Sequence, residues 1–195
     1  IAIIDYGVGN LLRIRRAVET LGHEAIITNS KNKINNCEIS ILPGVGSFDE
    51  GVSNINKYSL DETIKEVVKK GNKILGICLG LQLFFLKSEE SQIKGITGLN
   101  LIEGNVVSLE KKLCKSDAKI PHIGWSYFNK IEQKNKICKN IKLNHYMYYV
   151  HSFMVNPKNK KNIICDTKYF NISIPSIVKK DNIYGFQFHP EKSGK

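Results

Sequence analysis

The 195-residue chain is 42% hydrophobic and 24% charged, proportions that predict one globular domain spanning residues 1–195. No apolar run approaches the roughly 18 residues of a membrane helix and the N-terminal apolar run is too short for a signal peptide, so we expect a cytoplasmic chain without a membrane partner. The net charge of +11 comes from scattered lysines without interleaved aromatic residues, which favours a solvated face, open to an anionic substrate or acidic partner, over nucleic-acid binding.

Strand-like and helix-like segments alternate in the first half of the chain. Apolar runs predict strands over residues 1–5, 25–28, 39–42 and 73–77. Helical periodicity predicts helices up to residue 21, over 60–70 and over 79–86. Gly22 and Gly71 can end the first two helices in a left-handed conformation.

From about residue 99, strand-like segments replace this alternation. They cover residues 101–109, 146–155, 163–166, 173–179 and 183–188, separated by turns rich in lysine and asparagine. Together the two halves predict an α/β fold, a three-layer sandwich in which helices flank a mixed central sheet. The sequence stops shortly after residue 191 without a closing helix, so we expect a few native C-terminal residues to be missing.

Cys78 stands between a predicted strand and a predicted helix, in the sequence Gly76-Ile77-Cys78-Leu79-Gly80. Glycines on both sides allow a sharp turn that exposes the sulfur beside the helix N-terminus, where a thiolate is favoured. His189 and Glu191 follow a later predicted strand, with Pro190 between them. We interpret Cys78 as nucleophile, His189 as proton carrier and Glu191 as the carboxylate that fixes the imidazole tautomer.

Acyl attack also needs N–H donors for the oxyanion that forms. The backbone N–H of Leu79, directly after the nucleophile, is one candidate. The peptide of Val45, in Pro43-Gly44-Val45-Gly46, is the other, and its glycine neighbours would permit it to flip between two orientations.

The remaining cysteines carry no comparable signal. They are Cys37, Cys114, Cys138 and Cys165. The five cysteines form no CxxC pair and leave one over when paired, so we expect neither a zinc site nor a disulfide framework. Small buried hydrophobes are the ordinary role of such residues.

These elements together resemble the class I, triad-type glutamine amidotransferases over essentially the whole chain. Within that class, four segments are most similar to the glutaminase subunits of imidazole glycerol phosphate synthase: residues 5–11, 42–48, 121–125 and 149–152. The resemblance implies hydrolysis of glutamine through a cysteine thioester. It also implies a heterodimer with a cyclase subunit that uses the ammonia to make imidazole glycerol phosphate in histidine biosynthesis.

The resemblance implies two further sets of residues, and no cofactor or metal. The residues expected to hold glutamine are Gly44, Gly46, Gln82, Ser152 and Phe153. The residues expected to face the partner are Asn10, His122 and Trp125. From the residue types alone, Trp125 fits core packing and an interface equally, and His151 fits a structural role.

Alternatives stay open at the level of sequence. Ser126 and Phe153 stand where asparagine and tyrosine are more usual, so a paralogue that feeds ammonia to a surface-polysaccharide sugar amidotransferase is one alternative. A free-standing cysteine hydrolase or peptidase is a second, although it would not need Gly46, Gln82 and residues 121–125 in combination. A non-catalytic docking module is a third, but it would be expected to have lost part of the triad.

Overall fold

The computed structural model describes residues 1–113 and 118–194. Within them a nine-stranded sheet has the order β2-β1-β3-β4-β12-β11-β10-β7-β8. The strands are β1 (Ala2–Ile4), β2 (Ile26–Thr28), β3 (Ile39–Leu42), β4 (Lys73–Ile77), β7 (His122–Ile131), β8 (Tyr146–His151), β10 (Ile163–Tyr169), β11 (Ile172–Lys180) and β12 (Ile183–Phe186). Pairing is parallel from β2 to β12 and antiparallel from β12 to β8, which confirms the predicted mixed sheet.

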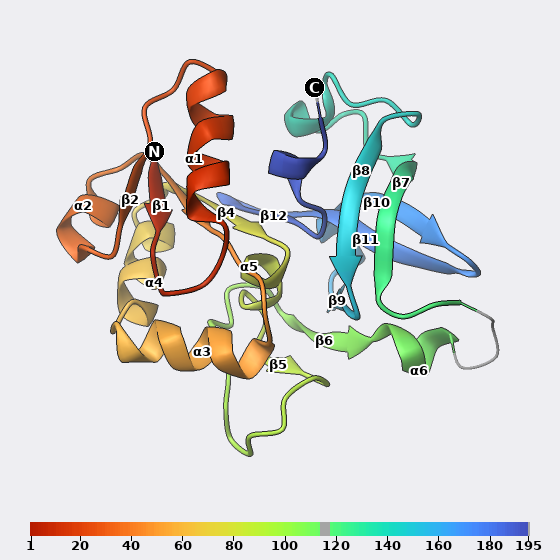
Figure 1. Ribbon diagram of the computed structural model, residues 1–195, viewed down its shortest axis with the longest axis horizontal. Coiled ribbons are helices and arrows are strands. Elements are labelled where there is room, and N and C mark those ends of the chain that lie inside the picture. The colour runs from red at the N-terminus through yellow and green to blue at the C-terminus, as the bar shows by residue number, and fades with distance from the viewer. Residues whose placement is uncertain (114–117, 195) are drawn as a thin grey trace.

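Most of the helices gather on the parallel half of this sheet, and the strand-rich second half lies beside it (Figure 1). The helices are α1 (Leu11–Thr20), α2 (Lys31–Asn35), α3 (Phe48–Lys57), α4 (Asp61–Lys69), α5 (Leu79–Gln82) and α6 (Leu109–Leu113), with 3-10 turns η1 (Lys136–Cys138), η2 (Lys160–Asn162) and η3 (Pro190–Lys192). In the described residues, no helix is both long and apolar enough to cross a membrane.

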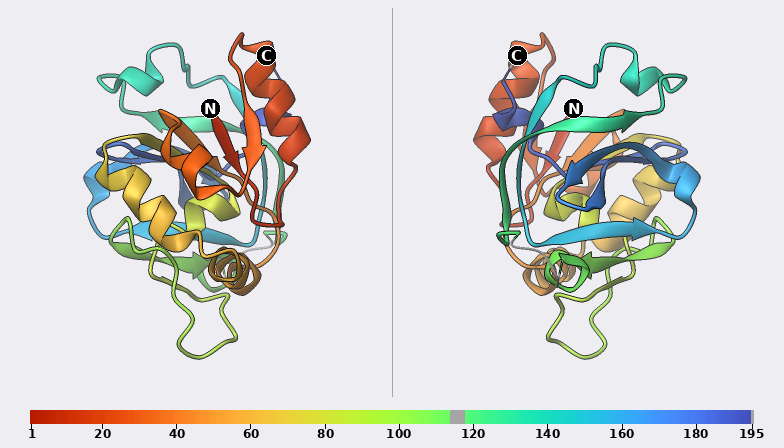
Figure 2. Two further views of the ribbon diagram at one scale, coloured as in Figure 1. Left: turned by 90° about the vertical axis from the view of Figure 1, so that its left-hand side faces the viewer. Right: turned by 90° about the vertical axis from the view of Figure 1, so that its right-hand side faces the viewer.

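Alternating side chains of β1 show why helices cover both faces of the parallel half. Ile3 packs with Ile14 and Val18 of α1, whereas Ala2 and Ile4 join the core that α2, α3 and α4 cover. Figure 2 shows α1 on one side of the red and orange strands and α4 on the other. A strand buried on both faces reads as a continuous apolar run, which is why the sequence predicted β1, β3 and β4 well.

Several predicted segments differ from the structure in their bounds, and two differ in kind. The strand predicted over 146–155 divides at Ser152 into β8 and β9 (Phe153–Pro157). β9 belongs to a second sheet, ordered β5-β6-β9, with β5 (Lys87–Ser88) and β6 (Gly104–Ser108). The helix predicted over 79–86 ends at Gln82, after which Leu99 and Leu101 donate hydrogen bonds to the backbone of Leu83 and Phe84.

Candidate active site

Cys78 occupies a strained turn between β4 and α5. Its φ is +53°, a left-handed conformation that is rare for a residue with a side chain. Its N–H donates to the carbonyl oxygen of Phe186 at 2.7 Å, which joins the turn to β12. A Cβ at Gly76 would lie 2.6 Å from the Leu81 nitrogen, so this close packing of α5 on β4 requires glycine.

His189 and Glu191 form a buried pair where the chain leaves β12. Nδ1 of His189 lies 2.9 Å from Oε1 of Glu191, and the two side chains are only 3% and 4% exposed. Burial disfavours the imidazolium, but hydrogen bonding and electrostatic attraction to the Cys78 sulfur and the Glu191 carboxylate outweigh burial and raise the pKa of His189 to about 9. His189 therefore carries a proton at neutral pH.

A cavity of about 330 Å³ brings most of the predicted residues together. Its lining includes Val45, Gly46, Cys78, Leu79, Gln82, Ser152, Phe153 and His189. These residues come from the loop after β3, from the turn into α5, from the junction of β8 with β9 and from the end of β12. Glu191 stands behind His189.

The oxyanion candidates lie on two walls of this cavity. Leu79 begins α5, and the first N–H groups of a helix have no intrahelical partner. Val45 is 45% exposed, and Gly46 beside it has a φ of +98°. Gly44 does not line the cavity: a Cβ there would lie 2.6 Å from the Cβ of Leu79, so this glycine lets the loop pack against α5.

The three residues expected at a partner surface lie in different environments. Asn10 is exposed and caps α1, its side chain accepting from the N–H of Arg13 at 3.2 Å. Trp125 is 52% exposed on β7. His122 is only 1% exposed, because its ring is stacked between Tyr149 and Tyr169, so its side chain belongs to the interior rather than to the surface.

Sequence reasoning missed three side chains at the site. Among the residues that the structure describes, Glu90 is the one carboxylate that lines the cavity, and its Oε2 accepts from the N–H of Phe48 at 2.8 Å. Burial raises the pKa of Glu90. Gln187 donates to Sγ of Cys78 at 3.8 Å, and His151 lines the cavity wall. Nothing in the sequence near Glu90 indicates that it lines the cavity, whereas Gln187 and His151 adjoin predicted site residues.

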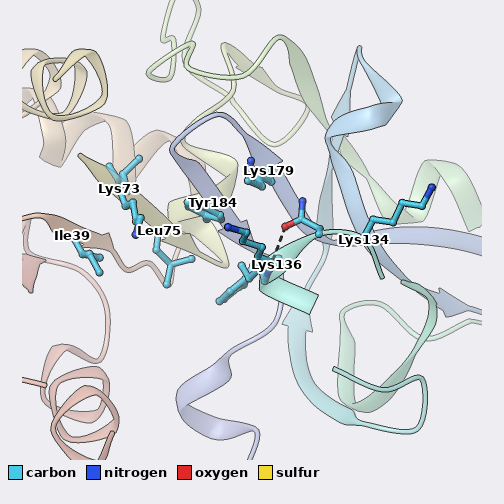
Figure 3. A pocket seen from close by; sticks show the side chains of 11 residues that line it. Ile39, Lys73, Leu75, Lys134, Lys136, Lys179 and Tyr184 are labelled. Carbon is cyan, nitrogen blue, oxygen red and sulfur yellow. Dashed lines mark hydrogen bonds between the residues drawn. The ribbon is translucent and has the colours of Figure 1, made fainter. Parts of the chain in front are cut away.

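A larger cavity, of about 670 Å³, lies away from these residues (Figure 3). Lysines surround this cavity, and Tyr184 and apolar side chains such as Leu75 line it. The ammonium group of Lys179 lies over the ring of Tyr184. Among residues 1–113 and 118–194, no thiol, imidazole or carboxylate lines this cavity. Across residues 1–113 and 118–194, no cluster of His, Cys, Asp and Glu could hold a metal ion.

Known proteins share both the sequence and the fold. The family Glutamine amidotransferase class-I matches residues 2–195. Imidazole glycerol phosphate synthase subunit HisH 2 of Methanococcus maripaludis is 45% identical, covering 100% of this chain and 93% of that protein. The HisH subunit of Prochlorococcus marinus is 40% identical, covering 100% of this chain and 92% of that protein.

Solved structures show the same fold at much lower identity. A glutamine amidotransferase superposes with a TM-score of 0.74 at 13% identity, covering 98% of this chain and 90% of the other. PurLQS from Thermotoga maritima gives a TM-score of 0.69 at 17% identity, covering 98% and 87%. The family match and the identity of 40% to 45% with HisH subunits over the full chain show that the chain belongs to the class I glutamine amidotransferases and, within them, to the HisH subunits of imidazole glycerol phosphate synthase.

Proposed function

We propose that the chain hydrolyses the side-chain amide of glutamine at Cys78 and delivers the ammonia to the cyclase subunit of imidazole glycerol phosphate synthase, for histidine biosynthesis. The observation that carries the reaction is the single cavity lined by Cys78, His189 and Leu79. Residues 1–195 act in this proposal as one glutamine amidotransferase domain.

Formation of a thioester is the first half-reaction. The Cys78 thiolate attacks the carboxamide carbon, and the C=O electron pair moves onto oxygen, where the N–H of Leu79 stabilises it. When this intermediate collapses, His189 gives its proton to the leaving nitrogen, the C–N bond breaks and ammonia departs. The Glu191 carboxylate holds Nδ1, so that Nε2 is the nitrogen that exchanges the proton.

Hydrolysis of the thioester is the second half-reaction. His189, now neutral, takes a proton from water, and the oxygen attacks the acyl carbon. The C–S bond then breaks, which releases glutamate and restores the thiolate beside the imidazolium.

Glu90 supplies the contact that distinguishes an amino acid from a simple amide. It is the one carboxylate of residues 1–113 and 118–194 that lines the cavity, so we assign it to the α-ammonium group of glutamine. Gln82 and the backbone at Ser152 and Phe153 line the same cavity and hold the rest of the substrate. Gly46 also lines the cavity, and a side chain there would meet the Glu50 carboxylate, because its Cβ would lie 2.7 Å from Oε2 of Glu50.

The partner surface of this proposal is the outward face of β7 and β8. Ile123, Trp125, Tyr127 and Tyr146 are large, exposed and apolar, and an apolar patch of this kind is typical of a protein interface. η3 contacts both α1 and β8, which connects this face to the helix that Asn10 caps. Docking there encloses the ammonia, which would otherwise be protonated by water.

Partner binding also regulates the reaction in this proposal. We assign the second oxyanion donor to the Val45 peptide, which turns its N–H towards the cavity when the partner binds its own ligand. The thiol chemistry further suits a cytoplasmic location, where reducing conditions keep Cys78 from oxidation.

The test measures glutamate release from glutamine by the chain alone, and then with a cyclase subunit and its ribonucleotide ligand. We expect stimulation by roughly two orders of magnitude or more, and loss of all release in Cys78→Ser but not in Cys37→Ser, a half-buried thiol outside the cavity. Release by Cys78→Ser near the wild-type rate would contradict the mechanism. A glutaminase that no cyclase binds or stimulates would contradict the partner and favour a sugar amidotransferase instead.

A further inference from the structure

Two buried histidines face each other beside the catalytic cavity. The register of β7 and β8 pairs His122 directly with His151, which places both rings on one face of the sheet. Nδ1 of His122 lies 3.0 Å from Nε2 of His151. The mechanism proposed above uses neither ring.

Both outer ring nitrogens are also hydrogen-bonded. Nε2 of His122 lies 3.0 Å from the hydroxyl oxygen of Ser126, and Nδ1 of His151 lies 2.9 Å from the carbonyl oxygen of Phe153. That same carbonyl accepts from Nε2 of Gln82 at 3.0 Å. A continuous line of hydrogen bonds therefore runs from β7 to a glutamine-binding side chain.

Neither ring of this pair is charged at neutral pH. Burial lowers the pKa of His122 to about 4. Burial first, and then the charges that His122 and His189 could carry, lower the pKa of His151 to about 3. Tyr149 and Tyr169 stack against the His122 ring at centroid distances of 4.9 and 4.1 Å, which fixes its plane.

The direction of every bond follows from these facts. The Phe153 carbonyl can only accept, so Nδ1 of His151 carries the hydrogen and its Nε2, in a neutral ring, can only accept. Nδ1 of His122 must then carry a hydrogen, which leaves its Nε2 as an acceptor for the Ser126 hydroxyl. One arrangement of hydrogens satisfies all four groups.

We propose that Ser126, His122 and His151 form a one-directional hydrogen-bond relay that positions the Phe153 carbonyl and, through it, the Gln82 amide for glutamine binding. This inference rests on the proposed function, because it concerns the substrate of that site. The three are positioning residues. Ser126 follows the exposed Trp125 on β7, so the relay begins next to the proposed partner surface and ends in the substrate cavity.

The first test reads the tautomers directly, by long-range proton–nitrogen NMR of the full-length chain labelled at histidine. We expect both His122 and His151 to be neutral and protonated at Nδ1 between about pH 5.5 and pH 8. A hydrogen on Nε2 of either ring, or titration of either ring in this interval, would overturn the relay.

The second test removes the outer donor. Ser126→Ala should raise the KM for glutamine about fivefold, the size expected for one lost hydrogen bond, while kcat changes much less. Ser126→Thr, which keeps the hydroxyl, should restore the KM, and Ser173→Ala, an exposed serine on β11, is the matched control.

Equal KM values for Ser126→Ala and the wild type would also overturn the relay, as would a rise that Ser126→Thr fails to reverse. The tautomers are read without turnover. A wild-type chain that releases no glutamate therefore contradicts the proposed function alone, and the NMR result still decides the relay.

Discussion

Glu191→Gln separates the two tasks of the buried His189–Glu191 pair. The amide keeps the size of the side chain and an oxygen that can still accept from Nδ1 of His189, 2.9 Å away in the wild type. It removes the negative charge that stabilises the imidazolium. The geometry is therefore kept while the proton affinity of His189 falls.

The magnitude follows from the raised pKa. A pKa of about 9 instead of 6.5 corresponds to about 3 kcal/mol in favour of the imidazolium. Cys78 and Glu191 share this effect, so we assign roughly half of it to the carboxylate. Removing the carboxylate in the variant should therefore lower the pKa of His189 by about one pH unit. The protonated form of His189 gives its proton to the leaving ammonia, so in the wild type kcat/KM falls as pH rises through about 9. In Glu191→Gln this fall should begin about one pH unit lower.

The assay is glutamate release across the pH range, combined with thermal unfolding. Because the pKa of His189 is raised in the folded state, its protonation stabilises the fold fully below about pH 6.5, and this stabilisation is lost as pH rises through about 9. Glu191→Gln should therefore cost more stability at low pH than at high pH. Glu62→Gln, on an exposed carboxylate of α4, is the control. A variant that folds normally and keeps the wild-type alkaline limb would refute the assigned role of Glu191.

Two further substitutions probe the cavity and its frame. Glu90→Gln should raise the KM for glutamine about 10- to 100-fold, the range expected for loss of a charged hydrogen bond, with little change in kcat. Glu103→Gln, at an exposed carboxylate, should change neither value. An unchanged KM in Glu90→Gln would exclude contact of Glu90 with the α-ammonium group. Gly80→Ala would stabilise an ordinary helix, but here the new Cβ would overlap the Leu42 carbonyl. Urea unfolding should therefore show a loss of about 3 kcal/mol in the free energy of unfolding, and glutamate release should collapse. A variant as stable and active as the wild type would contradict the packing described.

Local signals explain how much the sequence could predict. The strand, the turn and the flanking glycines at Cys78 lie within a few consecutive residues, and His189 and Glu191 are two residues apart, so a catalytic triad could be proposed before any fold was known. The fold class followed from the change from alternating strands and helices to strands alone. Both kinds of information are carried by near neighbours in the chain.

Long-range placement explains what could not be predicted. Residues 146–155 have the pattern of one strand, and only pairing with two different sheets divides this segment at Ser152. His122 alternates with exposed residues on β7, so its pattern does not reveal that two tyrosines cover it. Glu90 enters the cavity because its loop contacts α3, and that contact has no sequence signature.

The two strands that precede the proposed catalytic residues are direct neighbours in the sheet, although most of the second half of the chain lies between them. β4 and β12 pair in parallel, and the N–H of Cys78 bonds to Phe186. The intervening segment supplies Glu90, Phe153 and the aromatic face of β7. The same segment also holds the reactive pair, because β11 pairs with β12 and the N–H of His189 donates to the carbonyl oxygen of Tyr148 on β8 at 2.9 Å. A change in this segment that alters what is bound therefore also reaches the alignment of the sulfur and the imidazole, so binding and chemistry are mechanically coupled in this scaffold.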